Sequence, residues 1–301
     1  MKISIIGANG FLSTAIARYA NRNGWQLKMF GLEEPNSHQF DAFYLVNLVE
    51  EKIDYRLLVD SDMIIYASGA GIQANLKESK ELIYKLNVFI PIEICNELRD
   101  LDYKGVFVSF GSVFEMGESI ECRKSDEMDI IMAQNKAPNE YVVSKRMLTR
   151  FVSSYAHGFV HWHFIIPTIY GPGENVKRLI PYTIQAILKH QPLQFTSGDQ
   201  VRQYVYVDEV PRLLELAYEK NLASGIYGIE GNELLSVRQI VEIIHDYYHL
   251  QVSEDCFGKE NRADVGMKYL ALDGAKLRDA TGFVAVVKIR DVIAQYEQIV
   301  S

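Results

Sequence analysis

The chain has 301 residues, and 48% of them are hydrophobic, as expected for one large or two modest globular domains. Its net charge of -8 argues against nucleic acid or an anionic membrane as its main partner. The three cysteines, Cys95, Cys122 and Cys256, lack the spacing of a disulfide framework or a metal site. We therefore expect a cytoplasmic protein with reduced thiols, and neither a signal peptide nor a membrane span.

The chain opens on the pattern of a strand, a glycine turn and a helix. Lys2–Ile6 is a short β-branched run typical of a buried parallel strand, and residues 14–20 have helical composition. Between them, Gly7 permits a tight turn, and Gly10 lets the backbone approach a pyrophosphate at the helix N-terminus. Ser13 stands at the third glycine position and is small enough for close packing. This context predicts a dinucleotide-binding turn.

Further strands and helices alternate along the chain. Strands are expected at 27–30, 62–67, 105–110 and 163–167, and helical patterns at 82–99, 139–155, 179–188 and 236–248. This alternation predicts a parallel sheet covered on both faces, whose ligands bind at the carboxyl ends of the strands. Ser68, Ser109, Ser112 and Thr168 fall on that edge. We predict an α/β fold, a Rossmann-type doubly wound parallel sheet with a smaller C-terminal substrate-binding domain.

Tyr141 and Lys145 are the most informative pair in the sequence. They are four residues apart in a helical segment, so they share one face. A lysine ammonium near a phenol favours the phenolate and lowers its pKa toward neutrality. Such a tyrosine exchanges a proton with a sugar hydroxyl or ketone at physiological pH. Many such pairs are ordinary helix neighbours, but the glycine turn in the same half favours a catalytic role.

These motifs, in this order, resemble the extended short-chain dehydrogenase/reductases, the nucleotide-sugar epimerase/dehydratase family, over nearly the whole chain. Residues 62–69 resemble the family's fourth-strand segment, with Tyr66 where a histidine is usual. Asn87 resembles the family's helix asparagine. Residues 167–173 are similar to its Tyr-Gly-Pro segment, and residues 198–210 to the stretch that carries a substrate-phosphate arginine.

The resemblance implies hydride transfer between a nicotinamide and a sugar carbon, with Tyr141 as general acid/base and Lys145 lowering its pKa and binding the ribose. It also implies a Ser or Thr after the fifth strand that orients the reacting oxygen. Aligning 109–117 on Gly117 gives this role to Ser112. Aligning on residues 113–114 instead places Phe110, which cannot donate a hydrogen bond, at the Ser/Thr position. Ser109 is then the nearest hydroxyl. We favour Ser112.

The resemblance implies NAD or NADP as cofactor. The cofactor-binding residues are expected to be Gly7, Asn9, Gly10, Phe11, Leu12, Asn47, Leu48, Ala67, Ser68, Gly69, Asn87, Tyr141, Lys145 and Pro167. The second strand ends at Phe30-Gly31, without the acidic residue that binds the ribose of NAD or an arginine for a 2′-phosphate. The choice between the two dinucleotides therefore stays open.

The expected substrate is a nucleotide sugar held by its pyrophosphate between two arginines, Arg202 and Arg262, with Thr168 nearby. Guanidinium groups suit diphosphate oxygens, and an acidic protein must concentrate positive charge where an anion binds. A dehydratase would need an Asp-Glu pair after the Ser/Thr position, which is missing. We therefore predict a nucleotide-sugar 4-epimerase, with a 4-ketoreductase as the alternative and a non-catalytic NAD(P)-binding sensor as a contrasting class.

We expect the dinucleotide-binding domain to comprise residues 1–167 and about 203–229, and the substrate-binding domain residues 168–202 and 230–301. A homodimer is expected. His161 and His163 alternate on a strand and share one face, but the sequence offers no third ligand at a suitable spacing. We therefore predict no metal site.

Overall fold

The computed structural model describes residues 1–72, 76–260 and 266–300. Its main sheet has seven strands in the order β3-β2-β1-β4-β5-β6-β9, and every neighbouring pair is parallel. The strands are β1 (Lys2–Ile6), β2 (Gln26–Gly31), β3 (Ala42–Leu45), β4 (Met63–Tyr66), β5 (Val106–Ser112), β6 (Val160–Ile166) and β9 (Gly225–Gly228). The predicted Rossmann-type sheet is confirmed.

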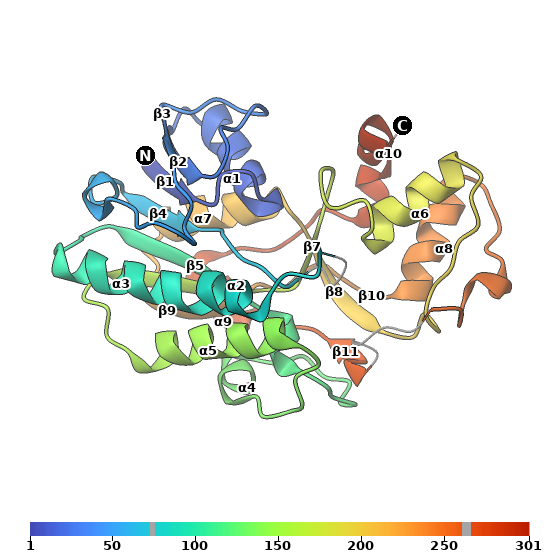
Figure 1. Ribbon diagram of the computed structural model, residues 1–301. Coiled ribbons are helices and arrows are strands. Elements are labelled where there is room, and N and C mark those ends of the chain that lie inside the picture. The colour runs from blue at the N-terminus through green and yellow to red at the C-terminus, as the bar shows by residue number, and fades with distance from the viewer. Residues whose placement is uncertain (73–75, 261–265, 301) are drawn as a thin grey trace.

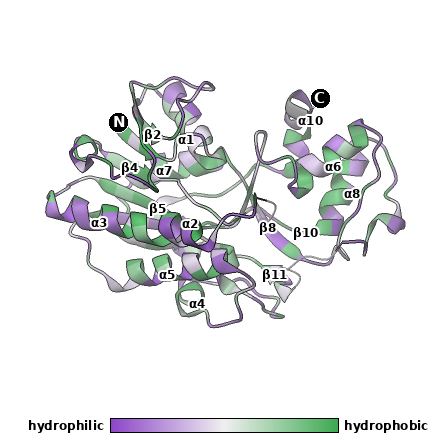
Figure 2. Cartoon of the chain, viewed as in Figure 1, coloured by the Kyte–Doolittle hydropathy of each residue, from purple (hydrophilic) through white to green (hydrophobic). Residues whose placement is uncertain are grey.

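Helices cover both faces of this sheet (Figure 1). One face packs against α1 (Phe11–Arg22) and α7 (Glu209–Glu219), and the other against α2 (Lys80–Tyr84), α3 (Ile90–Asp100) and α5 (Glu140–Ser154). Successive side chains of a strand point to opposite faces, so Val108 joins the core under α1 and α7 while Phe107 joins the core under α3. The central strands are accordingly hydrophobic along their length (Figure 2).

A smaller part of the protein lies beside the sheet, on the right of Figure 1. Its own sheet contains β7 (Thr168–Tyr170), β8 (Val201–Tyr206), β10 (Glu233–Ser236) and β11 (Tyr269–Leu270). Its helices are α6 (Leu179–Leu188), α8 (Val237–Tyr247) and α10 (Ile289–Val300), which pack on one another around a separate hydrophobic core. The predicted domain boundaries stay a prediction. From the smaller part the chain returns to the larger one at α9 (Ala275–Thr281), whose Leu277 packs in the core under α1 and α7.

The helix predicted at 82–99 is divided in the structure. A π-helical segment, Lys85–Phe89, separates α2 from α3, and it buries Asn87. Pro91 in the first turn of α3 has no N–H to continue a regular hydrogen-bond ladder, which is consistent with a local change of helix type. The strands β3 and β9 were not predicted, because these four-residue segments, Ala-Phe-Tyr-Leu and Gly-Ile-Tyr-Gly, lack the aliphatic run that marks β4. No helix of the described ranges is long and apolar enough to cross a membrane.

Candidate active site

Tyr141, Lys145 and Ser112 meet at the carboxyl end of β5. Tyr141 lies in the first turn of α5, a helix that begins after Asn139, whose side chain accepts a hydrogen bond from the Val142 N–H at 3.1 Å. The Ser112 hydroxyl is close enough to Tyr141 to lower its pKa by hydrogen bonding. Lys145 Nζ lies 5.9 Å from the centroid of the Tyr141 ring.

The pKa of Tyr141 differs from the sequence-based expectation. Burial raises it to about 12, and the Ser112 hydroxyl and the charge of Arg178 only partly oppose this shift. The Lys145 ammonium donates to the Phe110 carbonyl at 2.8 Å. Burial lowers the pKa of Lys145 itself to about 8. Burial thus has the largest effect on the pKa of Tyr141, and the catalytic role expected of Lys145 stays a prediction.

The two candidate serines of β5 lie in different surroundings. The Ser109 hydroxyl is fully buried and pairs with His161 Nε2 at 2.8 Å and His163 Nδ1 at 2.7 Å. Ser112 ends the strand and caps a 3₁₀ turn, Val113–Met116. The structure therefore brings Ser112 to Tyr141 and holds Ser109 in the interior. Phe110 contributes only its backbone carbonyl, which accepts from Lys145.

Glu115 is a site residue that the sequence reasoning missed. Its carboxylate is fully buried and accepts a hydrogen bond from the Ser112 N–H at 2.7 Å. Burial raises its pKa to about 7, and hydrogen bonds from Thr149 and the Ser112 backbone, with the charge of Lys145, oppose the rise. The sequence does indicate this contact, because Ser112 and Glu115 have the spacing of a capping box.

The glycine turn has the geometry of a phosphate cradle. Gly7 has a φ of +104°, and a Cβ there would stand 2.8 Å from the Ser68 backbone nitrogen, so a side chain is excluded. Gly10 precedes α1, and no described side chain caps that helix. Exposed Asn9 and Gly10, with half-buried Phe11 and Leu12, therefore leave backbone N–H groups for an anion. These residues fit the diphosphate of a dinucleotide.

The other predicted cofactor residues lie along the same edge of the sheet. They follow β3 (Asn47, Leu48), β4 (Ala67, Ser68, Gly69) and β6 (Pro167). Asn87 is different, because it is buried and its amide is engaged by protein groups. It donates to the Ala70 carbonyl at 2.8 Å and to Ser144 Oγ at 2.9 Å, and it accepts from the Ala70 N–H. Asn87 thus ties the loop after β4 to the helix that carries Tyr141.

The smaller part supplies the predicted substrate residues. Arg202 is buried in β8, with its guanidinium carbon 5.8 Å from the centroid of the Phe114 ring, in the turn that follows Ser112. Thr168 begins β7, and its buried hydroxyl has no hydrogen-bond partner among the described residues. Arg262 lies outside the described residues.

Arg178 was not predicted, because only the fold brings it near the site. It immediately precedes α6, and Glu174 accepts from its Nε at 3.1 Å. Its charge lowers the pKa of Tyr141, so the smaller part presents a cation toward the phenol.

An open depression of about 640 Å³ lies elsewhere, at the amino ends of β4, β5 and β6. It is lined by residues such as Asp62, Gly105 and Val160, which precede or begin these strands. Because Ser112 and the glycine turn lie at the carboxyl ends, this depression is separate from the candidate active site.

The chain resembles known proteins in sequence and in structure. Residues 3–229 match the model of the NAD dependent epimerase/dehydratase family. CDP-abequose synthase of Salmonella typhimurium is 26% identical over 131 residues, 42% of this chain and 42% of that protein. UDP-glucuronate 4-epimerase of Thermodesulfobacterium geofontis is 23% identical over 264 residues, 83% of this chain and 77% of that protein. The structure of UDP-glucose 4-epimerase from Thermotoga maritima with UDP-glucose superposes with a TM-score of 0.84 at 16% identity, covering 99% of both chains.

Proposed function

Because this chain belongs to the NAD-dependent epimerase/dehydratase family, we propose that it is a nucleotide-sugar 4-epimerase that works by hydride transfer at a sugar carbon. The sequence left NAD and NADP open, and because the family is NAD-dependent, the cofactor is NAD. The observation that carries the proposal is the convergence of Ser112, Tyr141 and Lys145 at the carboxyl end of β5, on the edge that also holds the glycine turn. Bound NAD would supply an acceptor and donor of hydride there.

The residues of the chain handle the proton and the position of the sugar. Tyr141 carries a proton at neutral pH, so it is ready to donate to a sugar ketone and must regain that proton from a sugar hydroxyl. Ser112, which lies beside the phenol, would hold the same oxygen by a hydrogen bond. Lys145 and Arg178 are cations near Tyr141 that would stabilise the phenolate during the exchange.

The cofactor would lie along the carboxyl edge of the sheet. The uncapped first turn of α1 would bind its diphosphate, and the loops after β3 and β4 would flank its adenosine and central part. Asn87 would act by holding the β4 loop against α5, since both hydrogens of its amide are already engaged. Lys145 would bind the nicotinamide ribose.

A nucleotide sugar is the substrate that the smaller part suits best. Arg202 is buried on β8 with its guanidinium beside Phe114, and Thr168 begins β7. A guanidinium is well shaped for a diphosphate. Arg178 would add a second cation near the sugar. The names of related proteins refer to CDP-, dTDP- and UDP-linked sugars. They support a nucleotide sugar as the substrate class but do not select one nucleotide base.

The second candidate is a nucleotide-sugar 4-ketoreductase. The raised pKa of Tyr141 favours it, because a protonated phenol donates readily to a ketone but is a poor base. Dehydration is disfavoured, because apolar Val113 and Phe114 follow Ser112 and the carboxylate of Glu115 is directed to the Ser112 backbone. A non-catalytic sensor is disfavoured by the complete set of Ser112, Tyr141 and Lys145.

The deciding experiment has two arms: the protein and NAD with UDP-, CDP- and dTDP-linked sugars, and the protein and NADH with the corresponding 4-keto sugars. An epimerase gives a product changed at one carbon without net formation of NADH. A ketoreductase consumes NADH only when a 4-keto sugar is supplied. Binding of NAD and nucleotide sugar without turnover of either kind would contradict both and favour the sensor.

A further inference from the structure

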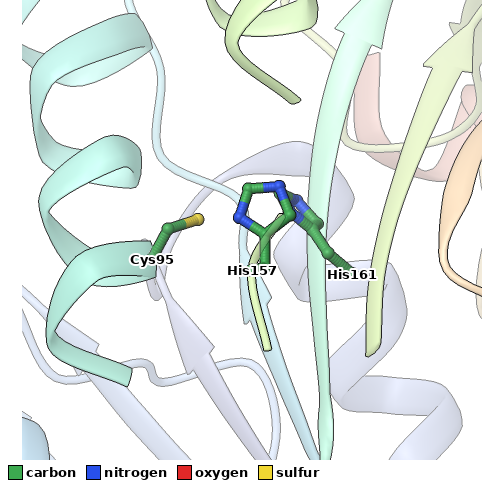
Figure 3. Close-up of side chains that lie close together, drawn as sticks. All are labelled: Cys95, His157 and His161. Carbon is green, nitrogen blue, oxygen red and sulfur yellow. The ribbon is translucent and has the colours of Figure 1, made fainter. Parts of the chain in front are cut away.

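Cys95, His157 and His161 form a buried cluster that the catalytic proposal does not use (Figure 3). Cys95 comes from α3, His157 from the segment after α5, and His161 from β6, and their donor atoms lie within 4.8 Å of one another. The exposed fractions of the three side chains are 1%, 6% and 1%. His161 pairs with Phe107 in the sheet, five residues before Ser112, or about 16 Å at about 3.3 Å per residue. The cluster is therefore separate from the active site.

The cluster contains polar atoms that lack hydrogen bonds. Both ring nitrogens of His157 and Nδ1 of His161 are buried and have no partner of hydrogen-bonding geometry within the described ranges. The Val152 carbonyl acts on the His157 ring and raises its pKa, but it does not offset burial, which lowers that pKa to about 4. Each buried unsatisfied group costs on the order of 1–3 kcal/mol. One nitrogen of each histidine lies within 4.8 Å of the Cys95 sulfur, so a ligand bound between the three side chains would satisfy buried polar atoms.

A hydrogen-bond network fixes which atom of His161 is free. Its Nε2 lies 2.8 Å from Ser109 Oγ, and the same oxygen lies 2.7 Å from His163 Nδ1. His163 Nε2 lies 2.9 Å from Thr149 Oγ1. The Thr149 hydroxyl donates to the buried Glu115 carboxylate, so it accepts from His163 Nε2. His163 Nδ1 is then an acceptor for the Ser109 hydroxyl, and Ser109 in turn accepts from His161 Nε2. Nδ1 of His161 then carries a lone pair toward the cluster, and the network serves as its outer support.

We propose that Cys95 Sγ, His157 and His161 Nδ1 bind a single soft, monovalent metal cation, Cu(I). Thiolate and neutral imidazole are the ligands that Cu(I) prefers. Binding releases the Cys95 proton to solvent and forms one sulfur–copper and two nitrogen–copper bonds without a change of oxidation state.

Charge and ligand number favour Cu(I) over Zn²⁺. A Cu(I)–thiolate unit is neutral, whereas Zn²⁺ with one thiolate leaves a positive charge among Phe107, Phe151 and Phe159. Zn²⁺ sites nearly always have four ligands, and the cluster within the described part of the chain has three.

The segment that carries His157 offers a route for the ion. His157 is a buried residue between exposed neighbours, with Ser153 to Ala156 before it and Gly158 after it. A local opening of this segment would expose Cys95 and His161 without disturbing the sheet. Metal binding would then pin the segment to α3 and β6, so the bound ion should stabilise the fold.

The test uses the full chain, with Cu(I) supplied under anaerobic conditions. The ion is added to the folded protein in one arm and during refolding in the other, and competition with a chelator measures the affinity. We expect about one Cu(I) per chain by native mass spectrometry, and a weakening of roughly 100-fold or more in Cys95→Ala and in His157→Phe. The His157→Phe variant should fold at least as well as the parent, because it replaces an unsatisfied ring by an apolar one. Retained NAD binding verifies that fold.

Cys256→Ala is the matched control for a buried cysteine outside the cluster, and Cys122→Ala for an exposed one. Both should keep the ion. Cu(I) should raise the midpoint of thermal unfolding of the parent by a few degrees and leave that of His157→Phe unchanged. The proposal is overturned if neither loading route gives stoichiometric Cu(I), if the cluster variants bind as the parent does, or if Zn²⁺ alone binds.

Discussion

The carboxylate of Glu115 accepts a hydrogen bond from the Ser112 N–H at 2.7 Å, which places a buried acid directly behind the hydroxyl that neighbours Tyr141. The same carboxylate raises the pKa of Lys145, while burial of the ammonium lowers it to about 8. Glu115 therefore links the position of Ser112 to the charge of Lys145, and a change of this residue should alter both.

Glu115→Gln should shift the pH dependence of kcat/KM. Lys145 loses its charge as the pH rises through its pKa of about 8, and removal of the nearby carboxylate lowers that pKa further. The alkaline fall of kcat/KM should therefore move to lower pH in the variant. Glu118→Gln, which changes an ion pair between half-buried Glu118 and exposed Lys136, is the control and should keep the parent profile. An unmoved alkaline limb would show that Glu115 does not act on Lys145.

The same substitution should change the pH dependence of stability. The pKa of Glu115 is raised from 4.5 to about 7 in the folded protein, so between these values the folded state binds more protons than the unfolded state. The contribution of Glu115 to the free energy of unfolding is then largest below pH 4.5 and falls as the pH rises to about 7. In urea titrations, the difference between parent and Glu115→Gln should fall over this window; a constant difference would refute the shift.

Tyr141→Phe should lower turnover by a factor on the order of 100 or more, because it removes the proton and keeps the ring. NAD affinity should stay nearly unchanged. Tyr84→Phe is a suitable control, since Tyr84 donates to Glu140 beside Tyr141 but lies outside the proposed chemistry. Steady-state kinetics and calorimetry with NAD measure the two effects, and turnover of Tyr141→Phe at the parent rate would remove Tyr141 from the mechanism.

Ser112→Ala should lower turnover, whereas Ser109→Ala should lower stability. Loss of the Ser112 hydroxyl should reduce kcat, because it lies beside Tyr141. Loss of the Ser109 hydroxyl should leave His161 and His163 without a shared partner and cost about 1–3 kcal/mol of stability. Turnover and urea unfolding of both variants check this. Equal, mild effects on turnover would contradict the placement of Ser112 in the site.

Arg202→Ala should weaken binding of the nucleotide sugar about tenfold or more, since a guanidinium–phosphate contact contributes roughly 1.5–3 kcal/mol. Arg202→Lys should recover only part of the loss, because lysine lacks the planar fork. NAD affinity should hardly change. Arg123→Ala, an exposed arginine paired with Asp129, is the control for net charge. Calorimetry with each ligand decides the matter, and an unchanged affinity for the nucleotide sugar would place its phosphates elsewhere.

The parts of the fold that depend on local patterns could be predicted from the sequence. The first strand was placed at its observed bounds, and α5 within one residue at each end, because a β-branched run and a continuous helical pattern are local signals. The site was predicted where motifs were contiguous, as with Tyr141 and Lys145. The cluster of Cys95, His157 and His161 could not be predicted, because its members come from separate elements that only the packing of α3 on β6 brings together.

The burial of charged groups was also beyond the sequence. The expected low pKa of Tyr141 followed from its spacing to Lys145, but spacing does not show that burial raises the pKa of the phenol. Glu115 was missed because a turn after Ser112 brings it near the phenol, and Arg178 because the smaller part approaches the phenol.

The most direct test of the central claim follows a deuterium label. The protein, with NAD, is given a nucleotide sugar deuterated at carbon 4 of the hexose, and the epimeric product is analysed by mass spectrometry and NMR. Hydride transfer through NAD predicts that the product keeps the deuterium at carbon 4. A product that carries solvent hydrogen at that carbon, or the absence of any conversion by protein that binds both ligands, would contradict the proposed 4-epimerase.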